Sequence, residues 1–340
     1  MSAHIQKPAQ AEAGAKARPH IGTRSLHGFL RIREASILVV AILLIIYFES
    51  SNSNFLTHAN LQTLSQFISA PVIIACGEIM LLICGEIDLS AGMVFALAPF
   101  LMYFAHDAGI PLSIAFILAL IGCGAIGLFN GFVSVKLKVP SFVTTLGTMF
   151  LINGFTLTIS AGFPVDTPTD SFFTTIMGNS GFQEITWAII IVLVMHGMLR
   201  NTRWGLHTIA VGGNLIGSAE SGINVTRIKI GNFVITGALA GLAGILEASR
   251  IGSTDPLAGG SPMMFLAVAA AVIGGTSLMG GSGTIIGGLF GGLVLGVLQD
   301  GFTIDGINAF TFNIIIGAAI LLAMVFNIHF ARLRTTRKRI

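Results

Sequence analysis

Residues 111–135 read PLSIAFILALIGCGAIGLFNGFVSV, a stretch without a single Asp, Glu, Lys or Arg. At about 1.5 Å of rise per residue, a helix of this length exceeds the roughly 30 Å of hydrocarbon in a bilayer. This stretch alone therefore predicts a transmembrane α-helix.

The rest of the chain repeats this pattern. Of its 340 residues, 54% are hydrophobic and only 10% are charged, and the mean hydropathy is +0.87. We predict an all-α polytopic membrane helix bundle of about ten transmembrane helices, because a soluble domain of this size does not have such a composition. The further apolar stretches are approximately 35–48, 61–84, 89–105, 141–161, 186–199, 230–250, 262–278, 284–303 and 308–328.

Basic residues predict the orientation of the bundle. Of 18 Lys and Arg residues, all but Arg250 fall before residue 34, around 136–138, within 200–229, or at 332–339. Placing these clusters in the cytoplasm satisfies the positive-inside rule. We therefore predict a disordered basic cytoplasmic N-tail at 1–34, a transmembrane domain at 35–330 and a basic cytoplasmic C-tail at 331–340. No folded element accompanies the tails, so they indicate orientation and not nucleic-acid binding.

Small residues recur inside the apolar stretches. Glycines lie four residues apart, for example at Gly127 and Gly131 and at Gly288, Gly292 and Gly296. This spacing allows neighbouring helix backbones to approach closely. The three cysteines, Cys76, Cys84 and Cys123, also lie within apolar runs, so we expect core thiols and no disulfide.

Three acidic residues interrupt the apolar pattern. Glu78 precedes the segment Gly85-Glu86-Ile87-Asp88-Leu89-Ser90-Ala91-Gly92. A charge at the bilayer centre costs about 2.5–3.5 kcal/mol on insertion scales, so these carboxylates need a partner, a water-filled cavity or an interfacial position. Glu78 and Glu86 are spaced to share one helix face, and Asp88 is spaced to cap the next helix. We take Glu78, Glu86, Asp88 and Ser90 as translocation or gating candidates, with structural hydrogen bonding as the alternative.

A second interruption lies at 273–284. Its glycines and hydroxyl groups, including Gly274, Gly275, Thr276 and Ser277, predict a hinge or tight interhelical turn and are further gating candidates. The segment is not a phosphate-binding loop, because no Lys in the chain follows a Gly. The sequence contains no His-Glu-x-x-His or Cys-x-x-Cys motif. We expect no catalytic residue, no metal site and no enzymatic activity in this chain.

Residues 201–225 are too polar to span a membrane. Glycines flank a predicted short helix at 215–221, which offers a docking point on the cytoplasmic side. A plain connector is the alternative.

Three motifs together resemble one family. These are the Gly85–Gly92 segment, the loop from Thr202 through Gly205, Gly212, Gly213 and Asn214 to Ser221 and Gly222, and Ile273-Gly274-Gly275-Thr276-Ser277-Leu278 followed by Gly280-Gly281. In order and spacing they are similar to the permease subunits of carbohydrate ABC importers, the ribose, arabinose, xylose and autoinducer-2 family. The resemblance covers about residues 36–328.

The resemblance implies a function and its partners. It implies a multi-pass permease of the bacterial inner (plasma) membrane that moves a sugar or sugar-like solute by alternating access. It also implies a second permease copy, an extracytoplasmic substrate-binding protein and a separate ABC ATPase subunit that uses ATP, with no cofactor in this chain. The loop at about 200–229 would couple to the ATPase. A stand-alone ion-coupled transporter using Glu78, Glu86 and Asp88 is the alternative.

The chain departs from the family pattern at two places. Residues 263–268 replace an acidic turn, and Leu206 replaces an arginine near the start of the coupling loop. Both departures bear on how the substrate is delivered to the permease and on which ATPase binds it.

Overall fold

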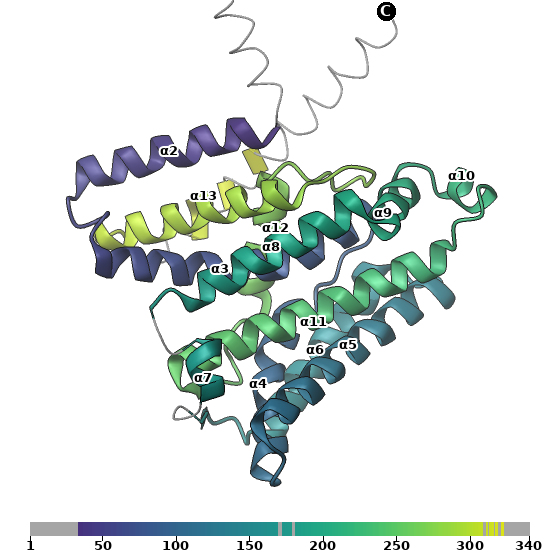
Figure 1. The fold of residues 1–340 in the computed structure, drawn as a ribbon, viewed down its shortest axis with the longest axis horizontal. Coiled ribbons are helices and arrows are strands. Elements are labelled where there is room, and N and C mark those ends of the chain that lie inside the picture. The colour runs from purple at the N-terminus through teal and green to yellow at the C-terminus, as the bar shows by residue number, and fades with distance from the viewer. Residues whose placement is uncertain are drawn as a thin grey trace, which may run out of the picture.

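The computed structural model describes residues 33–168, 172–178 and 181–308, together with 311, 313–315, 317, 318, 321 and 322. Within these residues the chain is built from helices joined by short turns (Figure 1). The helices are α2 (Arg33–Ser51), α3 (His58–Ile83), α4 (Ala91–Asp107), α5 (Leu112–Lys136), α6 (Ser141–Ile159), α7 (Phe172–Met177), α8 (Gln183–Asn201), α9 (Arg203–Gly213), α10 (Leu215–Glu220), α11 (Val225–Ile251), α12 (Gly260–Ile273) and α13 (Ile285–Ile304).

Among the described residues, seven helices are long and apolar enough to cross a membrane, namely α2, α3, α5, α6, α8, α11 and α13. Two further apolar helices, α4 and α12, have 17 and 14 residues. These nine correspond to nine of the predicted stretches. The tenth, 308–328, lies largely outside the described residues. The predicted all-α bundle is thus confirmed.

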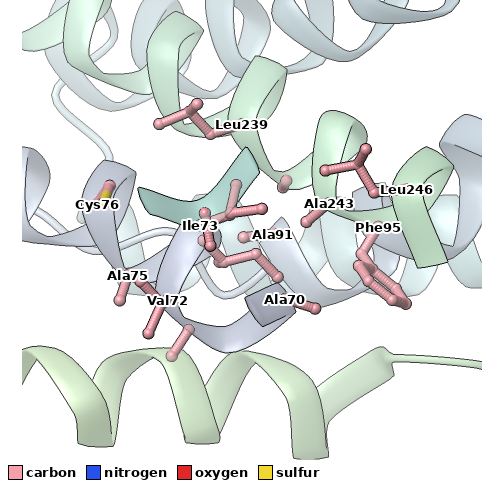
Figure 2. Packing of buried hydrophobic residues seen from close by; sticks show 14 of the residues in the cluster. Ala70, Val72, Ile73, Ala75, Cys76, Ala91, Phe95, Leu239, Ala243 and Leu246 are labelled. Carbon is pink, nitrogen blue, oxygen red and sulfur yellow. The ribbon is translucent and has the colours of Figure 1, made fainter. Parts of the chain in front are cut away.

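Helix α3 lies at the centre of the bundle. It packs against α8, α11, α12 and α13, and 89% of the residues in its most apolar stretch are buried. Helix α2 is peripheral. Only 17% of the residues in its most apolar stretch are buried, and it packs chiefly on α13. Figure 2 shows part of the central core, with side chains of α3, α4 and α11 in one cluster that includes Ala70, Val72, Ile73, Ala75, Cys76, Ala91, Phe95, Leu239, Ala243 and Leu246.

Glycines allow the close contacts of α13, as their spacing predicts. A methyl group on Gly291 would lie 2.1 Å from the carbonyl oxygen of Ala270 in α12. One on Gly292 would lie 2.3 Å from a methyl carbon of Val72 in α3. The glycine row Gly287 and Gly291 therefore packs α13 against α12, and the adjacent row Gly288, Gly292 and Gly296 packs it against α3. The buried cysteines are free thiols, as predicted.

Three sequence expectations about helix ends are wrong. Helix α3 ends at Ile83, so Glu86 lies outside it and does not share a helix face with Glu78. The stretch predicted at 262–278 stops being helical at Ile273, because the glycines that follow form a helix end. The stretch predicted at 230–250 begins earlier, at Val225, because the Asn224 side chain accepts a hydrogen bond from the Arg227 N–H and caps α11.

The two ends of the bundle differ. At one end, which we call the ladder end, β1 (Val165–Asp166) pairs antiparallel with β2 (Ser253–Thr254). Arg250, the exception to the basic pattern, lies here and pairs with Glu184 and Glu247 at 3.1 and 2.5 Å. At the other end, the α9 end, α9 contacts the end of α3, and α10 packs on α9 and α11 (Figure 1).

Candidate translocation and coupling site

The first break follows α3 and has a defined geometry. Gly85 adopts φ +76°, the left-handed conformation that glycine permits at a helix end. Its N–H donates to the carbonyl of Leu82, and the N–H of Glu86 donates to the carbonyl of Leu81, both at 3.0 Å. These two bonds form a Schellman motif, which satisfies the last carbonyl groups of α3 inside the protein.

The second break, after α12, has the same geometry. Gly275 adopts φ +88° and donates to the carbonyl of Val272 at 2.9 Å. The N–H of Thr276 donates to the carbonyl of Ala271 at 3.0 Å. The predicted gating candidates Gly274, Gly275, Thr276 and Ser277 thus lie at the end of α12 and in the turn to α13.

The two breaks contact each other and the end of α9. The N–H of Gly281, in the second break, donates to the carbonyl of Ile83 at 2.8 Å. Gly212 lies against both, because a methyl group there would fall 1.6 Å from the Ile83 oxygen and 2.7 Å from the Gly281 nitrogen. Three segments distant in sequence therefore meet backbone to backbone. We call this contact of Ile83, Gly212 and Gly281 the glycine junction. A methyl group on the neighbouring Gly213 would have nothing within 4 Å.

Side chains hold α9 onto the bundle. The indole N–H of Trp204 donates to Asn232 Oδ1 of α11 at 2.8 Å, and Asn232 Nδ2 donates to Thr208 Oγ1 at 3.3 Å. A methyl group on Gly231 would lie 2.3 Å from the Trp204 ring. Helix α9 is therefore packed against α11 and is not a free loop.

The remaining predicted coupling residues shape the turns around α9 and α10. Thr202 caps α9, its hydroxyl accepting from the N–H of Gly205 at 3.3 Å. Asn214 caps α10, its side-chain oxygen accepting from the Gly217 N–H at 2.9 Å. Ser221 closes α10, and Gly222, at φ +83°, follows it. The short helix predicted at 215–221 is confirmed as α10, whereas α9 was not predicted.

Asp88 lies in a buried polar network. Its Oδ1 accepts from the N–H of Ser90 at 2.9 Å and from the Ser90 hydroxyl at 2.5 Å. Asn130 Nδ2 of α5 donates to Ser90 Oγ at 2.9 Å, and Thr148 of α6 donates to Asn130 Oδ1 at 2.6 Å. All four side chains are buried. Asp88 therefore forms an Asx turn that leads into α4 and links the first break to α5 and α6.

Helix α6 also contacts the backbone of the first break. The N–H of Leu89 donates to Thr145 Oγ1 at 3.0 Å, and the N–H of Ile87 donates to Ser141 Oγ at 3.4 Å. The stretch between α3 and α4 is therefore held by side chains and is not a loose loop.

The other two acids have different surroundings. Glu78 is fully buried in α3, and its Oε2 accepts from the Asp88 N–H at 3.4 Å. Its Oε1 has no hydrogen-bond partner among the described residues. Glu86 instead pairs with Lys229 of α11, with 2.5 Å between Oε1 and Nζ.

Sequence reasoning missed Lys229, Asn130 and Asn232 as parts of this site. A signal existed for the two asparagines, because each stands inside or at the edge of an otherwise apolar stretch, where an unsatisfied amide is costly. For Lys229 no local signal existed, because its partner lies 143 residues away.

The comparisons with known proteins agree with this architecture. The family described as branched-chain amino acid transport system / permease component matches residues 60–324. The chain belongs to this permease family. The xylose/arabinose import permease of Sulfolobus acidocaldarius is 35% identical over 88% of this chain and 86% of its own length. The ribose import permease of Escherichia coli K12 is 36% identical over 86% of this chain and 93% of its own length.

The L-arabinose transport system permease of Escherichia coli K12 is 33% identical over 81% of this chain and 84% of its own length. No solved structure matches. The resemblance to the sugar ABC importer permeases is thus confirmed, and the permease is an integral membrane protein. The family description names amino acids, whereas these relatives are named for sugars.

Proposed function

We propose that this permease is the membrane-spanning subunit of an ATP-driven importer that moves a sugar across the bacterial inner membrane by alternating access. The relatives named for ribose, xylose/arabinose and L-arabinose make pentoses the first candidate substrates. The functional assembly would contain a second permease copy, an extracytoplasmic substrate-binding protein and ABC ATPase subunits. ATP would act in the ATPase subunits, since this chain carries no phosphate-binding loop. The basic residues favour a cytoplasmic α9 end and cytoplasmic termini.

The observation that carries this proposal is the glycine junction. The ends of α3 and α9 and the turn before α13 meet there without intervening side chains. Closely packed backbone has little room to compress, so a displacement of α9 has to move the other two segments as well. A force applied to α9 and α10 would therefore reach both breaks directly. This is what an ATPase bound at the α9 end requires.

Reconstitution in liposomes tests the proposal. The permease, its ATPase and its binding protein should take up radiolabelled ribose, xylose or arabinose only when ATP is present on the ATPase side. Uptake by the permease alone, driven by a proton or sodium gradient, would reject the importer and favour the ion-coupled alternative. The unpaired Glu78 carboxylate oxygen is the feature that this alternative would use.

Gly212→Ala should disturb the glycine junction and lower sugar transport. The added methyl group cannot fit against the Ile83 carbonyl, so α9 has to shift and the junction opens. We expect sugar uptake per inserted permease to fall by about tenfold or more, the factor that 1.4 kcal/mol of lost coupling produces. The measurement is uptake in the reconstituted assembly.

Gly197→Ala in α8 is the matched control, because a methyl group there meets nothing within 4 Å. It should insert and transport like the parent protein. The amount of Gly212→Ala permease purified from membranes measures its insertion. Normal uptake by an inserted Gly212→Ala permease would contradict transmission through the junction.

A further inference from the structure

The Glu86–Lys229 ion pair links two elements that no other ion pair among the described residues connects. Glu86 lies in the first break, and Lys229 lies in the second turn of α11. The side chains are 14% and 15% exposed, so the pair is largely removed from water. A partly buried pair of this kind contributes little net stability, but removal of one partner leaves an uncompensated charge. The position of one element therefore depends on that of the other.

The position of Lys229 along the chain lets the pair connect the region of α9 and α10 to the first break. Helix α10 ends at Glu220, and α11 begins a few residues later, at the cap formed by Asn224. Lys229 is thus on the first rigid element after the helix pair α9–α10. The Glu86–Lys229 pair reaches from there to the break between α3 and α4.

The first break is held in place without Lys229. The Schellman motif of Gly85, the Asp88–Asn130 contacts and the hydroxyl of Thr145 all bind it to α3, α5 and α6. The ion pair is consequently not needed to shape the break. What it adds is a charged connection to the start of α11, beside the hydrogen bonds that Asn232 of α11 donates to Met80 and Cys84.

We propose that Lys229 is a positioning residue for transport, which makes the first break follow the start of α11 when the ATPase moves the α9 end. Through Glu86 it adds a second, electrostatic connection beside the glycine junction. This inference rests on the proposed importer function. It predicts that loss of the pair lowers the number of sugar molecules moved per ATP hydrolysed, while the permease still folds and ATP is still consumed.

The test is the ratio of pentose uptake to ATP hydrolysis in the reconstituted assembly, measured with the pentose that the parent takes up fastest. For Lys229→Met and for Glu86→Gln we expect this ratio to fall by about two- to thirtyfold, the range in which mutations alter coupling between sites. Lys229→Arg should retain it. The charge-swapped double variant, Glu86→Lys with Lys229→Glu, should recover most of it.

Lys136→Met is the charge control, because Lys136 is an exposed cation in the last turn of α5, outside the coupling loop at about 200–229. Its ratio should equal that of the parent. A ratio unchanged in Lys229→Met, or a charge swap that recovers nothing although the protein is inserted, would overturn the inference. Failure of the parent assembly to use ATP for uptake would instead reject the proposed function, so the two failures are distinguishable. A lower melting temperature of Lys229→Met with an unchanged ratio would show a purely structural pair.

Discussion

At the scale of single residues, the three acids of the break region differ in what surrounds them. Glu86 has a cation, Asp88 has hydrogen-bond donors, and Glu78 has one oxygen without a partner among the described residues. A carboxylate accepts hydrogen bonds only, and Asp88 is surrounded by donors from Ser90 and Asn130. The network is therefore matched to a carboxylate at this position and not to an amide.

Asp88→Asn should weaken the first break. The new amide group is a donor facing other donors, so we expect the free energy of unfolding to fall by about 1–3 kcal/mol. Transport per inserted permease should fall more than expression does. Thermal unfolding in detergent and uptake in liposomes measure the two effects. Thr158→Val is the control, because Thr158 is exposed and its hydroxyl bonds only its own helix, at the Gly154 carbonyl. Normal transport by Asp88→Asn would show that the network only shapes the turn before α4.

At the scale of helices, apolar runs predict the spans well because hydrophobic length is a local property. Their ends are less predictable. Helix α12 is five residues shorter than the apolar run 262–278 suggests at its C-terminal end, because Gly275 turns the chain with a positive φ. Helix α11 starts before its apolar run because Asn224 caps it. A cap or a Schellman motif overrides hydropathy at a helix end.

Gly291→Ala should destabilise the packing of α13 on α12. Its methyl group would fall 2.1 Å from the Ala270 carbonyl oxygen, so the helices have to separate. We expect a loss of about 1–3 kcal/mol, as in other overpacked cores, and a lower melting temperature in detergent. Gly147→Ala in α6 is the control, because the methyl group there meets nothing within 4 Å. Equal melting temperatures for the two variants would show that the glycine row does not set the helix spacing.

At the scale of the whole molecule, the site is made by contacts between distant segments. The glycine junction joins the ends of α3 and α9 to the turn before α13, and the ion pair of Glu86 joins residues 143 positions apart. The sequence predicts each of the three motifs separately, because each has a local glycine and hydroxyl pattern. It does not predict their contact, which depends on how the helices pack. The glycine spacing indicates only that the packing is close.

The orientation of the permease can be tested because its native cysteines are all buried. The basic residues predict that the α9 end lies in the cytoplasm and that the ladder end faces outward. We therefore expect Phe163→Cys, next to β1, to react with a membrane-impermeant maleimide in spheroplasts. Ile216→Cys, on α10, should react only after the membrane is opened. Both positions are 71% exposed, so a difference in labelling cannot come from burial within the chain. The reverse labelling pattern would place α9 and α10 outside, where no ATPase could reach them, and would reject the coupling role of the glycine junction.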